Sequence, residues 1–385
     1  MSYSTLVRDE APVVTLLPGP AAISAHEWNA LVSPGGFYSS HAWVAGLAHA
    51  HGPSPVLSAF SAGRLEGVVP TWTNADSTGL FSLEEMTRTL PGVVSADYLW
   101  LGTQRSTANV ATITRNPAKR ARILRALLEH ARHLAARKGL KGVLWPYLSG
   151  PSAQEIASSH PLAHAVLHST DAVVNVPTDG MAGLESSVSS KERMKWRRER
   201  RIFRSSCSSV EWTSLSPDVC ERVAPLLANT RDKYGSPGGT AWMRRTLSGQ
   251  LSSGVARNAF VALVHRGNDV TAAALFYGHG DWLYGRYWGA SHAAPDYAYF
   301  VLTHYEAVDF AAQHGFRRLH LSVPASKSKT SRGAALTPLA LVAVPSGATS
   351  IEGRALTFVN RRRAQDWIGA APSAGPETLD PEWIP

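Results

Sequence analysis

The chain has 385 residues, which is long for one domain and comfortable for two. Hydrophobic residues make up 44% and charged residues 17%, so the chain has enough apolar material for a core and is not disordered as a whole. Its net charge of +9 favours acidic partners such as nucleic acid, nucleotides or anionic surfaces. The two cysteines, Cys207 and Cys220, exclude a disulfide framework and a cysteine-based zinc site.

The N-terminal stretch MSYSTLVRDEAPVV carries acidic residues near its start and has no basic region before an apolar core, so it is not typical of a secretory signal. No run reaches about 18 consecutive apolar residues, and no transmembrane helix is predicted. We therefore expect a cytoplasmic protein.

Two segments read as β-hairpins, PVLSAFSAGRLEGVVPTW at 55–72 and NAFVALVHRGNDVTAAALFYG at 258–278. Each is followed by a helix that ends at a glycine and leads into a strand, at 123–145 and at 301–321. Aligning Gly139 with Gly315 also pairs three alanines in the two helices, and glycine after the last helical residue is a common cap. The repeated order predicts two related α/β domains, 1–165 and 166–385. The alternative is that the two segments resemble each other only because α/β units in general look alike.

The segment KERMKWRRERRIFR, at 191–204, predicts a cationic helix within 185–205, with serines before it that can cap its start. At 100° per residue, Trp196 and Phe203 share a narrow face with Glu192 and Glu199. The candidate nucleic-acid-binding residues are Lys191, Arg193, Lys195, Arg197, Arg198, Arg200, Arg201 and Arg204. A solvated charged face and a phosphate-rich partner are both open interpretations. A second basic patch follows at 115–128.

The C-terminal part alternates aromatic residues, glycine and arginine in WLYGRYWGA at 282–290, which is typical of a strand that a ligand or backbone can approach closely. The loop SVPASKSKTSRGAALTP, at 322–338, sets Lys327, Lys329 and Arg332 among small residues, as a phosphate site requires. The sequence has no P-loop, no GxGxxG, no metal-spaced cluster and no GxSxG elbow.

Six stretches together resemble the FemAB-like branch of the GNAT N-acyltransferase superfold. They are GGFYSSHAWVAGL, SSKERMKWRRERRIFR, LLANTRDKYGSPGGTAWMRRTL, GRYWGA, THYEAVDFAAQHGF and KSKTSRGAALTP. The resemblance covers most of the chain, and GRYWG and the Lys-x-x-Arg-Gly loop are its distinctive parts. It implies two tandem GNAT-like α/β domains, each a mixed, mostly antiparallel sheet flanked by helices.

The resemblance also implies amide-bond formation from an acyl group carried by coenzyme A or by tRNA. The substrate-binding positions that it implies are Arg286, Tyr287, Trp288, Lys329 and Arg332, to which the loop cation Lys327 is added; Tyr305 falls on a helix tyrosine of the family. The chain departs from the family where Tyr299 and Val301 replace His and Glu, and where Lys327 and Ser328 replace a Glu-His pair. Two candidate acid–base groups are therefore missing.

An aminoacyl ester or thioester is already activated, so an enzyme has mainly to position the amine, stabilise the oxyanion and receive a proton. The candidate catalytic residues are Tyr305, Asp296 and Glu306. Each has an alternative reading: a half-buried helix aromatic, a helix cap and a solvated carboxylate, respectively. The alternative for Arg286 is that it is only a residue of the sheet surface. For three aromatic residues the alternative is a place in the core: Trp282, Tyr287 and Trp288.

The extended cationic helix favours aminoacyl-tRNA as the co-substrate, because a tRNA acceptor arm presents many phosphates and RNA is also read by aromatic stacking. Acyl-CoA is the alternative donor, and a non-enzymatic basic RNA-binding protein on a GNAT scaffold is the second alternative. The expected partners are tRNA and a small-molecule or peptide amine acceptor, with no permanently bound cofactor and no metal. The Pro/Ala/Gly-rich tail from about 370 is expected to be mobile.

Overall fold

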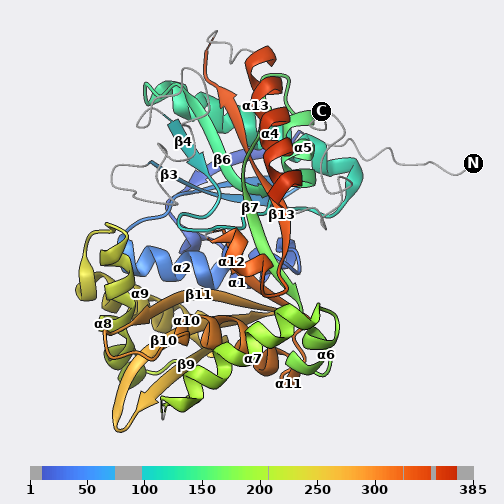
Figure 1. Cartoon of the computed structure of the whole chain (residues 1–385). Coiled ribbons are helices and arrows are strands. Elements are labelled where there is room, and N and C mark those ends of the chain that lie inside the picture. Colours follow the sequence, from blue (N-terminus) through green and yellow to red (C-terminus); the bar gives the residue numbers. More distant parts are fainter. Residues whose placement is uncertain (1–10, 74–97, 207, 324, 348–352, 371–385) are drawn as a thin grey trace, which may run out of the picture.

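The structure, a computed structural model, describes residues 11–73, 98–206, 208–323, 325–347 and 353–370 (Figure 1). The expected mobile tail and Cys207 lie outside these residues, whereas Cys220 is a buried free cysteine. No helix in the described part of the chain is long and apolar enough to cross a membrane.

Thirteen strands of the described residues form one sheet in the order β1-β2-β3-β4-β6-β13-β7-β12-β11-β10-β9-β8, with β5 paired to β3. Their ladders are antiparallel except for β4–β6 and β11–β12, which are parallel. This confirms the predicted mixed, mostly antiparallel α/β architecture. The strands are β1 (Val13–Leu17), β2 (Val56–Ser61), β3 (Arg64–Thr73), β4 (Tyr98–Leu101), β5 (Thr112–Ile113), β6 (Gly142–Ser149), β7 (His164–Asn175), β8 (Ser208–Ser214), β9 (Ala259–Arg266), β10 (Asp269–His279), β11 (Trp282–Ala290), β12 (Arg318–Ser322) and β13 (Ala335–Pro345).

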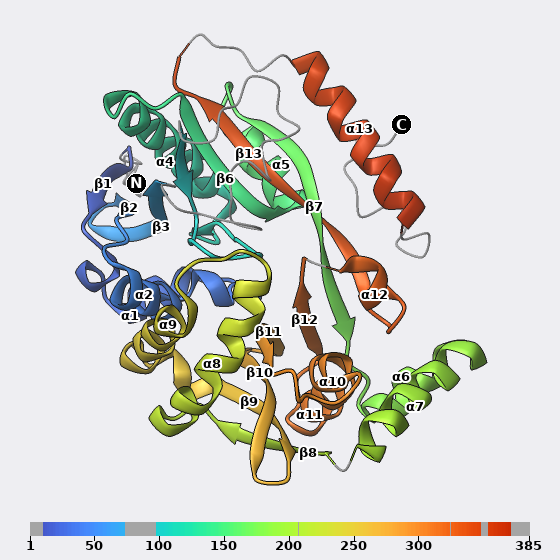
Figure 2. The same cartoon turned by 60° about the vertical axis from the view of Figure 1, so that its left-hand side comes forward.

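Helices flank this sheet in both halves (Figures 1 and 2). Those of the first half are η1 (Pro20–Ala22), α1 (Ala25–Leu31), η2 (Phe37–Ser39), α2 (His41–His51), α4 (Pro117–Arg137) and α5 (Gly150–Ser158). Those of the second half are α6 (Met181–Ser186), α7 (Ser190–Ser205), α8 (Pro217–Lys233), α9 (Gly239–Ser253), η4 (Val255–Asn258), α10 (Ala298–Phe300), the π-helix η5 (Val301–Glu306), α11 (Ala307–Gln313), α12 (Ser326–Thr330) and α13 (Gly353–Ala370).

The repeat expected from the sequence is visible as a repeated order of elements. In the first half, hairpin β2–β3 is followed by β4, α4 and β6, and in the second, hairpin β9–β10 is followed by β11, the α10–α11 helix and β12. Gly139 and Gly315 end the two helices with φ of 71° and 76°, a left-handed conformation that glycine adopts without strain. In the first half β6 lies parallel to β4, and in the second half β12 lies parallel to β11.

The two halves share strands as well as a contact surface. The predicted boundary at 165/166 falls inside β7, which pairs with β13 along most of its length and with β12 at its C-terminal end. Strand β13, from late in the chain, lies between β6 and β7 and so completes the sheet of the first half. The boundary between independently folding domains stays a prediction.

One buried apolar cluster draws residues from both halves, among them Leu127, Trp145, Leu319 and Val342. Helix α2 packs on α9 closely enough that a Cβ on Gly249 would lie 2.4 Å from the Gly46 carbonyl oxygen. Such close packing fixes the two halves against each other, which matters because the candidate site lies where they meet.

Candidate active site and cationic face

Strands β11 and β12 are paired only where they start. Trp282–Tyr284 pair with Arg318–His320, after which β11 continues to Ala290 beside β10 alone. Strand β12 ends at Ser322, whose φ of 66° turns the chain away towards α12. The loop with the three predicted cations therefore begins where the two parallel strands separate, as Figure 2 shows at β11, β12 and α12.

Arg286 lies at this separation, on a bulge of β11: Tyr287 pairs with Leu275 and Gly285 with Phe276, which leaves Arg286 without a counterpart on β10. Its Nη2 donates to the Arg105 carbonyl oxygen at 2.7 Å. Its guanidinium lies 5.7 Å from the ring of Tyr38 and 4.8 Å from that of Tyr287. Arg286 is thus enclosed by aromatic rings and by a segment of the first half, rather than lying on an open sheet surface.

A buried acid–imidazole pair that the sequence did not reveal lies beside Arg286. Asp171 Oδ2 on β7 is 3.0 Å from His320 Nε2 on β12, and the two side chains are 8% and 1% exposed. The ring of Tyr38 meets that of His320 edge-on at 5.9 Å. Burial raises the pKa of Tyr38 to about 12, so its phenol stays protonated at neutral pH. Asp171 and His320 are far apart in the sequence, so only the pairing of β7 with β12 brings them together.

Lys329 is buried beneath the α12 loop, with 2% of its surface exposed. Its Nζ donates to the carbonyl oxygens of Leu321 at 2.5 Å and Ser322 at 2.7 Å, at the end of β12. Burial lowers the pKa of Lys329 to about 8, and the nearby charge of Asp171 acts in the opposite direction. Lys329 therefore fixes the strand end, and one of its three N–H donors remains beyond the two that these carbonyls accept.

Arg332 and Tyr305 meet at a third buried residue, Glu199 of α7. Arg332 Nη2 donates to Glu199 Oε1 at 2.7 Å, and the Tyr305 hydroxyl donates to Glu199 Oε2 at 2.5 Å. Arg332 Nε also donates to the Tyr305 oxygen at 3.2 Å, and its guanidinium covers the Phe300 ring. Burial and the Glu199 carboxylate raise the pKa of Tyr305, which keeps its proton. Both predicted site residues thus have partners inside the protein.

His304, next to Tyr305 on the π-helix η5, is a further residue that the sequence reading passed over. Its Nδ1 is 2.8 Å from the Thr303 hydroxyl, whose own proton goes to the Tyr299 carbonyl oxygen. The ring must therefore carry its proton on Nδ1, which leaves Nε2 with a lone pair and no hydrogen-bond partner among the described residues. Burial, and then the positive charges of Lys329 and Arg332, lower the pKa of His304 to about 3.

The remaining predicted site residues each have surroundings of their own. Trp288 is partly buried against the ring of Tyr299 at 5.4 Å, and Lys327 is exposed on α12. Asp296 is exposed two residues before α10, whose first-turn N–H groups receive no side-chain cap. Glu306 lies with Arg200 and Arg204 around a cavity of about 220 Å³, and its burial raises the pKa of its carboxyl.

The predicted cationic helix forms as α7, and its narrow face is the buried one, with Trp196, Glu199 and Phe203 at 0%, 4% and 3% exposure. Ser189 and Glu192 form a capping box that fixes its start. Trp196 Nε1 donates to the Ser331 carbonyl oxygen at 2.9 Å, which docks the helix on the α12 loop. The sequence therefore predicted this buried face correctly, but it did not reveal the partner of Glu199.

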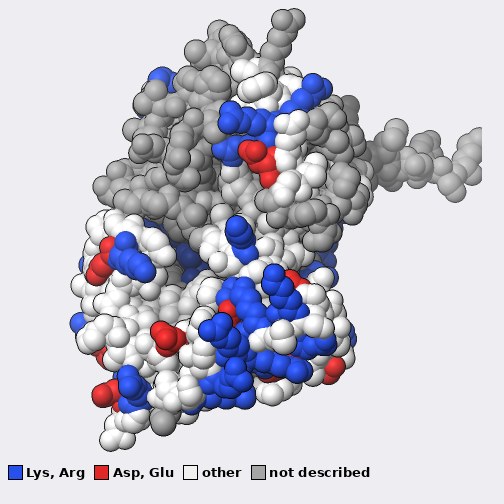
Figure 3. All heavy atoms as spheres, in the orientation of Figure 1, with Lys and Arg blue, Asp and Glu red and all other residues white. Residues whose placement is uncertain are grey.

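The cationic face of α7 consists of the eight predicted nucleic-acid-binding residues, and Figure 3 shows lysine and arginine side chains gathered over this part of the molecule. Arg197 and Arg200 both pair with Glu185, and Lys195 Nζ donates to the Ser331 hydroxyl at 3.2 Å. Lys191, Arg198 and Arg201 make no hydrogen bond or ion pair with any residue that the structure describes. These three exposed cations are available to an anionic partner.

A family model, FemAB_like, described as peptidoglycan biosynthesis/recognition, matches residues 20–340, which is most of the chain. The chain belongs to the FemAB-like family. This confirms the resemblance seen in the sequence, and it sets aside the non-enzymatic alternative, because family and fold together identify an acyltransferase.

Solved structures agree on the fold of this FemAB-like protein at low sequence identity. A structure of FemX is 11% identical with a TM-score of 0.53 and covers 85% of this chain and 96% of that one. A conserved protein of unknown function from Bacteroides thetaiotaomicron VPI-5482 is 11% identical with a TM-score of 0.53, covering 86% and 100%. No curated protein matches the chain.

Proposed function

We propose that this FemAB-like acyltransferase moves an aminoacyl group from aminoacyl-tRNA to an amine of a small molecule or peptide. The observation that carries the proposal is the position of the cationic face of α7. The helix that bears it docks through Trp196 on the α12 loop, and Lys195 reaches Ser331 of that loop. A polyanion bound along α7 would therefore have its end within reach of the separated strands β11 and β12.

The exposed cations of this face suit a long phosphate-bearing carrier better than a single diphosphate. Each phosphate that an arginine or lysine neutralises releases counterions and adds affinity that salt removes. Lys191, Arg198 and Arg201 are spread over about three turns of one helix, and no described acid pairs with them. Charged tRNA is made in the cytoplasm, so the proposal also assigns the reaction to that compartment.

The chemical step needs little from the protein beyond positioning. The amine nitrogen attacks the carbonyl carbon of the aminoacyl ester, the C–N bond forms, and the ester C–O bond breaks. The leaving ribose hydroxyl takes up the proton that the amine loses, directly or through a protein group. Positioning the two reactants removes several kcal/mol from such a barrier, so the absence of the family's His and Glu at Tyr299 and Val301 is tolerable.

For proton transfer, Glu306 is the strongest of the three catalytic candidates, because its raised pKa and its cavity suit a carboxyl that can gain and lose a proton. Tyr305 is engaged with Glu199, and Asp296 is exposed. Arg286, Tyr287, Trp288, Lys327, Lys329 and Arg332 remain the proposed substrate-binding residues around the strand separation.

The direct test supplies the purified protein with a charged tRNA pool, synthetases, ATP, labelled amino acids and a panel of amines. We expect label in an amide product, and its loss when RNase is added. If coenzyme A carries the acyl group instead, acyl-CoA will support transfer in the presence of RNase, and the tRNA proposal is wrong.

A binding measurement tests the role of α7 separately. The variant Arg198→Ala with Arg201→Ala should reduce the slope of log affinity for tRNA against log salt by about 2, because two phosphate contacts are lost. Arg222→Ala with Arg257→Ala removes two exposed cations from other elements, α8 and η4, and should leave the slope unchanged. Equal slopes in wild type and the α7 variant would exclude this helix from the donor site.

A further inference from the structure

A second cavity lies away from α7, between α13 and the strands β7 and β13. Its volume is about 670 Å³. One wall carries His168, Ser169 and Thr170 of β7 with Ser326 of α12, and the opposite wall is one side of α13. The family match ends at residue 340, before α13 begins, so this cavity depends on a helix that the family model does not include.

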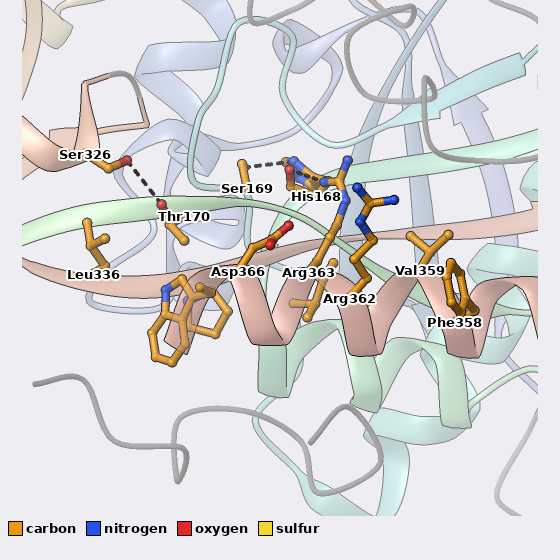
Figure 4. Close-up of a pocket in the computed structure, with 13 residues that line it drawn as sticks. His168, Ser169, Thr170, Ser326, Leu336, Phe358, Val359, Arg362, Arg363 and Asp366 are labelled. Atoms are coloured by element: carbon orange, nitrogen blue, oxygen red, sulfur yellow. Dashed lines mark hydrogen bonds between the residues drawn. The ribbon is translucent and has the colours of Figure 1, made fainter. Parts of the chain in front are cut away.

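The helix wall of the cavity is cationic. Arg362 and Arg363 rise from α13 towards His168 on β7, and Asp366 one turn further along points the same way (Figure 4). Arg363 Nη1 donates to the His168 carbonyl oxygen, which holds that arginine against the strand. Arg362 is exposed and has no hydrogen bond or ion pair with the described residues. Two arginines against one carboxylate leave the cavity with a positive charge, and Arg362 is the cation available to a ligand.

On the strand wall of the cavity, His168 sets the direction in which the Ser169 hydroxyl can donate. The Tyr147 backbone N–H donates to His168 Nε2 at 3.2 Å, so in the neutral ring the proton lies on Nδ1. Burial and the charge of Arg363 lower the pKa of His168 to about 3, so the ring is neutral at physiological pH. Nδ1–H then donates to Ser169 Oγ at 2.8 Å, which leaves the Ser169 hydroxyl proton free to donate elsewhere.

This arrangement favours binding over covalent catalysis. Because His168 donates to Ser169, it cannot remove the serine proton, and Ser169 is not an activated nucleophile. A free arginine and a serine O–H are donors suited to phosphate oxygens. The hydroxyls of Thr170 and Ser326 lie 3.3 Å apart and bond to each other, and Ser326 Oγ also donates to the Val323 carbonyl oxygen.

The rest of the lining is apolar. Phe358, Val359 and Trp367 of α13 face Leu167, Leu336 and Pro338 of the strands. Phe358 is 68% exposed, so its ring is accessible to a ligand in the cavity that it lines. A ligand of matching shape therefore has an anionic end near Arg362 and an apolar or planar portion near Phe358.

We propose that the cavity between α13 and β7 binds a phosphorylated small molecule with an apolar or planar organic portion. Arg362 and the Ser169 hydroxyl hold its phosphate groups, and Phe358 contacts its organic portion. The site is separate from α7, and this proposal does not depend on the identity of the acyl donor.

Calorimetric titration of the full chain with three probes tests this proposal: inorganic pyrophosphate, uridine diphosphate and geranyl diphosphate. We expect at least one of the organic diphosphates to bind more tightly than pyrophosphate. Arg362→Gln should weaken that binding about tenfold or more, the usual effect of losing a hydrogen-bonded charge on a phosphate. Phe358→Ala should remove the advantage of the organic diphosphate over pyrophosphate.

The control is Arg361→Gln, which removes the same charge from the neighbouring position of α13 but lies outside the cavity lining. It should leave affinity within about twofold. All three side-chain positions tested are exposed, and unchanged melting temperatures will show that the variants are folded. Failure of every probe to bind wild type at millimolar concentration, or equal losses in Arg361→Gln and Arg362→Gln, would overturn the proposal. Because the readout is binding, the result is independent of whether any aminoacyl transfer is observed.

Discussion

At the scale of single residues, the interior of this protein contains cations that are hydrogen-bonded and almost fully buried. Lys329 is the clearest case, since its ammonium group donates to two backbone carbonyls at the end of β12 and is 2% exposed. Backbone carbonyls compensate only part of the lost hydration, and the charged form is therefore less favoured in the folded state than in the unfolded state.

Because of this difference, the free energy of unfolding should depend on pH in a defined direction. The pKa of Lys329 is about 8 when folded and 10.5 when unfolded, so between these values the unfolded state binds more protons. The free energy of unfolding of wild type should therefore rise from pH 8 to pH 10.5 relative to that of Lys329→Met, by at most about 3 kcal/mol. Urea denaturation of both proteins at several pH values measures the difference. Parallel pH profiles would show that Lys329 is not desolvated.

At the scale of elements, the two sides of α7 have different roles. Its exposed side carries the cationic face, whereas its buried side places Glu199 between Arg332 and Tyr305. Like charges four residues apart weaken an isolated helix, so the docking of Trp196 and the Glu199 network offset that cost. The same glutamate also fixes the α12 loop through Arg332, which couples the proposed tRNA surface to the proposed substrate loop.

Glu199→Gln tests this coupling. It leaves the buried Arg332 guanidinium without its counter-charge, and breaking a buried ion pair from one side typically costs 3–5 kcal/mol; we expect a loss of about 3 kcal/mol in the free energy of unfolding. The double variant Glu199→Leu with Arg332→Met, which removes both charges, should recover much of this loss. A loss below about 1 kcal/mol in the single variant would mean that the pair is not desolvated.

At the scale of the whole molecule, the two repeats are joined into one sheet rather than merely tethered. Strand β13 follows the second repeat in the sequence but pairs with β6 of the first, and β7 pairs with β13 and with β12 of the second repeat. Separating the chain at the predicted boundary would expose the edge of β6 and the apolar residues beneath it. Both halves should therefore unfold together.

A fragment of residues 1–165 tests this expectation and the predicted boundary at once. It lacks β13 and most of β7, so we expect no cooperative melting transition by circular dichroism. Joining residues 1–175 through a short Gly/Ser linker to residues 335–347 restores β7 and β13 as an antiparallel pair and should recover a transition. A cooperative melt of the 1–165 fragment alone would establish it as an independent domain.

Local patterns in the sequence determined several features that the structure reproduces. The positions of Trp196, Glu199 and Phe203 predicted the buried side of α7, because a helix repeats every 3.6 residues whatever surrounds it. Glycines at 139 and 315 marked the two helix ends, since their left-handed conformation is a local requirement. The family motifs identified an acyltransferase fold for the same reason: each is a short, contiguous stretch.

Only the tertiary structure decided which residues meet. Asp171 and His320 become neighbours through the pairing of β7 with β12, and Glu199 meets Arg332 through the docking of α7. The cavity at Arg362 exists because α13 packs beside β7, a contact between segments almost two hundred residues apart that no periodicity in either segment encodes. Short-range sequence patterns report the conformation and the buried side of an element. Its partner is chosen by packing over the whole chain, and in this protein the candidate sites lie where distant elements meet.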